Sequence, residues 1–156
     1  MRVYRLIRAP WVSQALTGEG ARRYGSRWNS KGVPMVYAAS TLSLAALETL
    51  VHFAVDTAPV DYVALTIRVP DDAVEHLANK ELPADWYATA PPAECQQLGA
   101  RWVAEAQSLG LAIPSVVVPS ETNILLNPLH PDFANVVLEK QEPFLFDSRL
   151  LEKDRR

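Results

Sequence analysis

The chain has 156 residues, a length typical of one domain, with a formal net charge of −3 and one cysteine, Cys95. Hydrophobic residues make up 49% of it and charged residues 21%, the balance of a folded domain rather than a disordered one. A single cysteine excludes an internal disulfide, no apolar run is long enough for a membrane span, and the acidic charge balance disfavours direct nucleic-acid contact. Because the sequence shows no signal-peptide segment, we expect a cytoplasmic protein.

Hydrophobic patterning predicts five strands and two helices. In chain order they are a strand at 3–7, a strand at 35–39, a helix at 41–55, a strand at 61–69, a helix from Pro91-Pro92 to Gly110, and strands at 115–118 and 144–147. Residues 71–90 are polar and predict an irregular surface segment. Because strands outnumber helices and do not alternate with them, we predict a single α+β domain.

The predicted helix at 41–55 carries a carboxylate on its apolar side. At about 100° per residue, Glu48 falls beside Leu44 and Val55, and His52 follows it at i+4. The helix is apolar almost all round, so we expect it to be central and buried. A buried carboxylate needs partners and often marks a functional site. Two interpretations of Glu48 stay open, a catalytic group or a buried ion pair that fixes packing, and His52 either bonds to Glu48 or fills the core.

A polar loop precedes this helix in the chain. Arg27 lies between Gly25 and Gly32, and glycines allow the backbone to approach a ligand. Its planar guanidinium suits phosphate or carboxylate, although a solvated basic turn is equally compatible with the pattern. Tyr37 lies on the strand at 35–39, where a tyrosine usually packs in the core or across strands. Only its position between Arg27 and Glu48 makes it a candidate.

Other polar residues have weaker patterns. Ser115, Asn123, Asn127 and His130 lie in segments rich in proline, where short polar side chains usually form turns, so we leave their roles open. Arg5 alternates with apolar residues on the first strand and could point into a cleft. No dinucleotide or phosphate-loop motif, no Cys/His cluster with metal spacing and no nucleophile elbow is present, which disfavours hydride transfer, kinase chemistry and zinc hydrolysis.

Taken in order, several segments resemble the RES domain, the toxin half of a bacterial toxin–antitoxin pair. They include Gly25-Ser26-Arg27-Trp28-Asn29, Val36-Tyr37-Ala38-Ala39, Leu44-Ala45-Ala46-Leu47-Glu48, Pro114-Ser115 and Asn127-Pro128-Leu129-His130-Pro131. The arginine, glutamate and serine of the family name correspond to Arg27, Glu48 and Ser115. The resemblance implies a domain over residues 1–152, followed by a charged tail at 153–156. It also implies a fold similar to ADP-ribosyltransferases, in which two small mixed or antiparallel sheets with flanking helices form an NAD+ cleft.

The resemblance assigns a role to each candidate residue. Glu48 would stabilise the charge that develops when the nicotinamide–ribose bond of NAD+ breaks, and Arg27 would hold the pyrophosphate. Tyr37 would stack on nicotinamide or ribose, Ser115 would orient Glu48 or the ribose, and His52 would support the site. No metal is implied.

The same resemblance predicts a toxin that arrests growth by depleting NAD+ through hydrolysis or phosphorolysis. The alternatives are a mono-ADP-ribosyltransferase that modifies a cellular protein and, in another class, a non-catalytic partner-binding module. An RNA-cleaving toxin is disfavoured by the acidic balance. The expected partner is an Xre-like helix-turn-helix antitoxin that covers the cleft, and a homo-oligomer is compatible with the apolar content.

Overall fold

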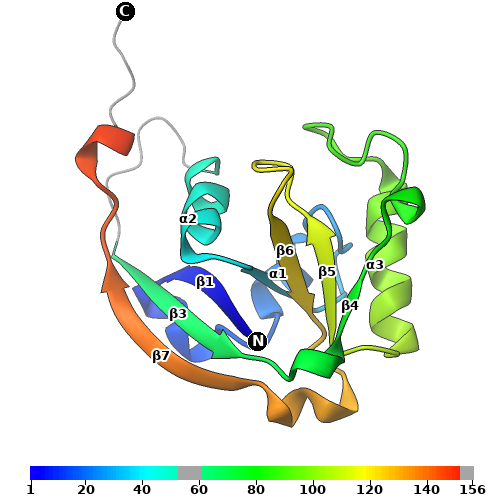
Figure 1. Ribbon diagram of the computed structural model, residues 1–156, viewed down its shortest axis with the longest axis horizontal. Coiled ribbons are helices and arrows are strands. Elements are labelled where there is room, and N and C mark those ends of the chain that lie inside the picture. Colours follow the sequence, from blue (N-terminus) through cyan, green and yellow to red (C-terminus); the bar gives the residue numbers. More distant parts are fainter. Residues whose placement is uncertain (53–60, 152–156) are drawn as a thin grey trace, which may run out of the picture.

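The computed structural model describes residues 1–52 and 61–151, and the seven strands within these ranges form one mixed sheet of order β4-β5-β6-β2-β1-β3-β7 (Figure 1). The strands are β1 (Arg2–Arg8), β2 (Val36–Ala39), β3 (Tyr62–Arg68), β4 (Val74–His76), β5 (Gly110–Pro114), β6 (Thr122–Leu126) and β7 (Val137–Phe144). The helices are α1 (Glu19–Tyr24), α2 (Leu42–Leu50) and α3 (Ala93–Glu105), and 3-10 turns lie at Ala9–Gln14, Asp71–Ala73, Asn79–Glu81, Pro131–Asn135 and Ser148–Leu150. The predicted single α+β domain is confirmed.

The sheet is narrowly joined at its centre. β1 pairs with β3 along its whole length, from Arg2 opposite Arg68 to Arg8 opposite Tyr62, whereas β1 pairs with β2 only through Tyr4 and Ala39. We call this single pair the seam, and the two parts that it joins the β4-β5-β6-β2 leaf and the β1-β3-β7 leaf. The expected division into two separate sheets is not confirmed, because one ladder pair still connects the leaves.

The hydrophobic core fills the two leaves and the helices around them. α2 places Leu44 and Ala45 against Leu6 and Ala39, directly over the seam. α3 packs against β5 and the loop before β2, through a cluster that includes Trp28, Cys95, Trp102, Leu111 and Ile113. Figure 1 shows α2 above β1 and α3 along the β4 side of the sheet. The core therefore fixes one helix over the seam and the other against the loop that carries Arg27.

The first predicted helix begins where expected but is not central. Thr41 caps α2 by accepting a hydrogen bond from the backbone of Leu44, which confirms the predicted start. Its described helical part ends at Leu50, and residues 53–55 of the prediction lie outside the described residues. Leu47 is 38% exposed and Val51 58% exposed, so the expectation of a buried helix is wrong. α2 lies on one face of the sheet with its other side open.

The second predicted helix is too long at its C-terminal end. α3 ends at Glu105, where Ala106 takes a left-handed conformation with φ of 47°. Gly110 does not stop the helix but starts β5, where an added Cβ would lie 2.9 Å from the Val74 side chain on β4. Close approach of two strands, rather than a helix end, accounts for this glycine.

Two strand predictions are displaced. Residues 115–118 are not a strand, because β5 ends at Pro114 and the Ser115 hydroxyl accepts hydrogen bonds from the backbone of Val117 and Val118, which turns the chain. The strand expected at 144–147 meets only the last residue of β7. The segment predicted to be irregular contains the short strand β4, and α1 and β6 were not predicted.

Candidate active site

Glu48 lies in the last turn of α2 and is held by two neutral donors. Its Oε1 accepts hydrogen bonds from the Ser115 hydroxyl at 2.7 Å and from Asn123 Nδ2 at 2.5 Å. Ser115 is fully buried just after β5, and Asn123 lies on β6 opposite Ala39. Both bonds fall on one carboxylate oxygen, so they fix the rotamer of Glu48 without using Oε2. The contact expected between Ser115 and Glu48 is therefore present.

Asn123 is a partner of Glu48 whose role the sequence left open. Its segment, Glu121-Thr122-Asn123, follows a proline and was interpreted as a turn because β6 was not predicted there. The uninterrupted apolar run at 124–126, directly after Asn123, was the available signal of a strand.

Tyr37 ties β2 to the loop that carries Arg27. Its hydroxyl accepts a hydrogen bond from the Trp28 backbone at 3.2 Å and donates one to Asn29 Oδ1 at 2.8 Å. Asn29 is fully buried, and its amide donates to the carbonyl oxygens of Ala21, Ser30 and Val33. Burial raises the pKa of Tyr37 to about 12, so its hydroxyl stays protonated at neutral pH.

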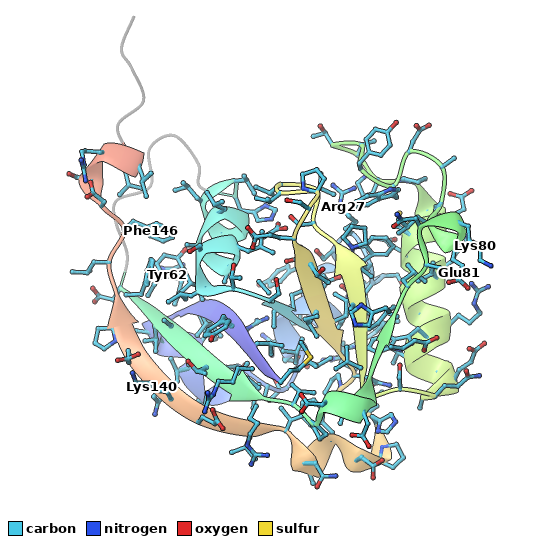
Figure 2. All side chains as sticks on the ribbon, in the orientation of Figure 1. Arg27, Tyr62, Lys80, Glu81, Lys140 and Phe146 are labelled. Carbon is cyan, nitrogen blue, oxygen red and sulfur yellow. The ribbon has the colours of Figure 1, made fainter. Side chains whose placement is uncertain are left out.

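Arg27 connects this loop to the segment before α3. Its Nη1 donates hydrogen bonds to the carbonyl oxygens of Trp86 and Ala88, and the Trp28 and Trp86 rings pack with centroids 6.3 Å apart. Figure 2 shows Arg27 near the upper ends of β5 and β6, beside the loop that leads into α3. Both bonds use the hydrogens of Nη1 alone, so this nitrogen holds the loop to the segment before α3.

Two cavities meet at Glu48. The first, of about 350 Å³, lies over the seam, and the second, of about 540 Å³, extends toward the segment before α3. Both are lined by Ser26, Tyr37, Glu48, His52 and Asn123. We refer to them as the seam cavity and the loop cavity. The carboxylate thus stands at the junction of two open spaces.

The predicted site residues divide between these cavities. Tyr37, Glu48 and His52 line both of them, and Arg27 lines the loop cavity. Ser115 contacts Glu48 by donating a hydrogen bond to its carboxylate. His52 is exposed at this rim, so the alternative in which it fills the core is wrong.

Asn127 and His130 lie elsewhere and have structural contacts. The fully buried Asn127 donates a hydrogen bond to the Val103 carbonyl and accepts one from the Leu129 backbone. His130 caps the Pro131–Asn135 turn by accepting a hydrogen bond from the Asp132 backbone. Neither residue lines the seam cavity or the loop cavity.

Arg5 brings a partly buried positive charge into the seam cavity. Its Nη1 donates a 2.6 Å hydrogen bond to the Tyr37 carbonyl, next to the point where β1 and β2 separate. Its Nε is buried with no hydrogen-bond partner among the described residues. Burial lowers the pKa of Arg5 to about 10, which still leaves it protonated at neutral pH. A partly buried cation that lines a cavity favours an anionic ligand.

The described residues show neither a metal site nor a membrane-spanning helix. Residues 1–52 and 61–151 contain no group of three His, Cys, Asp or Glu side chains placed to hold a metal ion. Within the same ranges, no helix is long and apolar enough to cross a membrane. The titratable groups that line the two cavities are one oriented carboxylate, two arginines, a histidine and four tyrosines.

Comparison with known proteins gives the family. The model of the RES domain matches residues 2–147, so this chain belongs to the RES domain family and the resemblance seen in the sequence is confirmed. "Toxin Res" of Photorhabdus laumondii is 40% identical over 152 residues, covering 97% of each chain. The "Prs ADP-ribosylating toxin" of Sphingobium is 38% identical over 141 residues, covering 88% of each chain.

A solved structure shares the fold. A chain of the M. tuberculosis MbcT–MbcA toxin–antitoxin complex superposes with a TM-score of 0.70 at 22% identity. The match covers 92% of this chain and 83% of that one.

Proposed function

We propose that this chain is the toxin of a toxin–antitoxin pair and that it arrests growth by cleaving the nicotinamide–ribose bond of NAD+. The observation that carries the proposal is Glu48, a carboxylate fixed by Ser115 and Asn123 at the junction of two cavities. The names of the RES relatives, which are toxins, support the same conclusion.

The geometry suits the charge that this reaction develops. When the bond between ribose C1′ and the nicotinamide nitrogen breaks, its electron pair leaves with nicotinamide and the ribose becomes oxocarbenium-like. A carboxylate that is already oriented stabilises this charge without rearranging. Water or phosphate then attacks C1′ and releases a proton, giving ADP-ribose or its phosphate ester.

The other site residues take supporting roles in this proposal. Arg5 provides the partly buried cation for the pyrophosphate, and Arg27 adds a second positive charge from the loop cavity. The Tyr37 ring packs against nicotinamide or ribose, while its hydroxyl stays bonded to the Arg27 loop. His52 lies at the rim, where it contacts ribose or the leaving group.

A second candidate is mono-ADP-ribosylation of a protein. It shares the first bond broken and differs in the group that attacks C1′. The relative named for ADP-ribosylation, at 38% identity, favours it. So does the loop cavity, which also reaches Glu48 and has the exposed Tyr87 in its lining.

The partner in this proposal is an Xre-like antitoxin that covers the cleft in the cytoplasm. The superposed RES-like fold comes from a toxin–antitoxin complex. Val51 and Tyr87 are exposed in the lining of the loop cavity and supply an apolar rim for such a partner.

The proposal is tested by incubating purified protein with labelled NAD+, with and without phosphate and cell extract. Free ADP-ribose indicates hydrolysis, its phosphate ester indicates phosphorolysis, and label on a protein indicates transfer. We expect Glu48→Gln to lose at least about 100-fold in turnover, while Glu105→Gln, an exposed carboxylate on α3, keeps wild-type activity. If NAD+ stayed intact under every condition, the proposed enzymatic activity would be refuted.

Growth arrest separates an enzyme from a non-catalytic binding module. Expression of the wild-type chain should arrest growth, and Glu48→Gln should relieve the arrest while the variant stays folded. A folded Glu48→Gln protein that remained fully toxic would instead support the binding module.

A further inference from the structure

A third cavity lies beside the seam, between β1, the Ala9–Gln14 turn and α1. Its volume is about 490 Å³, and we call it the α1 cavity. Arg5 and Tyr62 line both this cavity and the seam cavity. Tyr62 packs edge-on against Phe146, and Figure 2 shows the two side chains next to each other. The α1 cavity is thus a neighbour of the site that contains Glu48.

Two large aromatic side chains are exposed in the α1 cavity. Trp11 is 50% exposed in the Ala9–Gln14 turn, and Tyr24 is 78% exposed at the end of α1. The hydrophobic core does not account for them, since neither belongs to a core cluster among the described residues. Exposed aromatic rings beside a hollow are suited to stacking on a planar base.

The α1 cavity is also positively charged. Arg5, Arg8 and Arg23 line it, against a single acidic residue, Glu19. Glu19 already accepts hydrogen bonds from Arg22 and Arg23, which hold its pKa down to about 2. The cavity therefore keeps a cationic excess in a chain whose formal net charge is −3, a balance that favours a phosphorylated ligand.

We propose that the α1 cavity binds the adenosine end of the dinucleotide, with adenine stacked on Trp11 or Tyr24 and the pyrophosphate at Arg5. This inference rests on the proposed function, because it extends the NAD+ site rather than adding a separate one. Arg5 connects the seam cavity to the α1 cavity, because its guanidinium lines both of them. Its buried Nε has no hydrogen-bond partner among the described residues. Nicotinamide and its ribose then lie at Glu48, on the far side of Arg5.

Calorimetric titration tests the assignment with two ligands that differ by the adenosine half. Glu48→Gln serves as the background so that NAD+ stays intact, and nicotinamide mononucleotide is the ligand that lacks adenosine monophosphate. We expect Trp11→Ala to weaken NAD+ binding about tenfold, since stacking of one base contributes about 1–3 kcal/mol. Binding of nicotinamide mononucleotide should not change, and Trp11→Tyr should restore most of the NAD+ affinity.

The matched control is Leu145→Ala, which truncates another exposed apolar side chain outside the three cavities. Unchanged NAD+ binding in both Trp11→Ala and Tyr24→Ala would overturn the inference, and so would an equal loss for both ligands. If the wild-type protein fails to turn over NAD+, the proposed function falls. Titration of wild type and Trp11→Ala with ADP-ribose then decides the adenosine site by itself.

Discussion

At the scale of single residues, the orientation of Glu48 depends on hydrogen bonds from two neutral side chains. Ser115 and Asn123 reach the same oxygen of Glu48 from a chain segment about 70 positions away. A carboxylate on a helix would otherwise sample several rotamers, and each rotamer away from the ribose would be unproductive. In the proposed reaction these two donors are positioning residues, which would act on the substrate through Glu48.

Removing one donor should slow the reaction without unfolding the protein. For Asn123→Ala we expect kcat for NAD+ cleavage to fall about tenfold with little change in KM, because an oriented charge acts mainly in the transition state. Steady-state turnover of labelled NAD+ measures both constants. Asn79→Ala, in an exposed turn, is the control, and full kcat in Asn123→Ala would show that Ser115 alone orients Glu48.

At the scale of elements, the packing of α3 fixes the loop that carries Arg27. A Cβ added at Gly99 would lie 1.7 Å from the Trp28 carbonyl oxygen, so no larger residue fits while the helix stays in place. We expect Gly99→Ala to lower the free energy of unfolding by about 1–3 kcal/mol. Gly20→Ala, on α1 with nothing within 4 Å of its added Cβ, should be neutral or slightly stabilising. Denaturant titration of both variants compares them, and equal midpoints would contradict this packing.

The N-terminal turn of α1 has a pH-dependent contribution. Arg22 and Arg23 hold the pKa of Glu19 down to about 2, below its usual 4.5. A depressed carboxyl pKa stabilises the fold above the unfolded pKa and loses that effect as the pH falls from about 4.5 to about 2. Wild type should therefore be more stable than Glu19→Gln at pH 6, and the difference should shrink toward pH 2.5. A difference that stayed constant with pH would contradict the ion pairs.

The elements that sequence predicted well are those whose patterns are local. β1, β2 and β3 show apolar runs or alternation, and Thr41 is a typical helix cap. β7 was not predicted because it is an edge strand that is exposed along most of its length. Glu48 was predicted from its place on an apolar helix, whereas Asn123 could not be assigned without knowing that β6 lies beside β2.

At the scale of the whole molecule, the proposed site places the ligand in contact with both leaves. Arg5 belongs to the β1-β3-β7 leaf, and Tyr37 and Asn123 belong to the other, so a dinucleotide over the seam touches both. At 100 times its Kd, ADP-ribose should stabilise the fold by about 2.7 kcal/mol. That corresponds to a rise in Tm of about 5–10 °C for a chain of this size.

Thermal unfolding with and without ADP-ribose measures this effect. Arg5→Met should reduce the rise in Tm, because it removes the partly buried cation while keeping an apolar stem of similar length. A rise of the same size in Arg5→Met would place the pyrophosphate elsewhere.

The seam also affects when the sheet can be completed during synthesis. Among the described strands β1 comes first, but its leaf is completed only by β7, which follows the other six in the chain. Glu48 emerges early and meets Ser115 and Asn123 only after some 70 further residues have been made. In a growing chain the Glu48 carboxylate therefore stays without its two donors until Asn123 has been made, so the proposed site, and any partner surface that depends on it, forms late in synthesis.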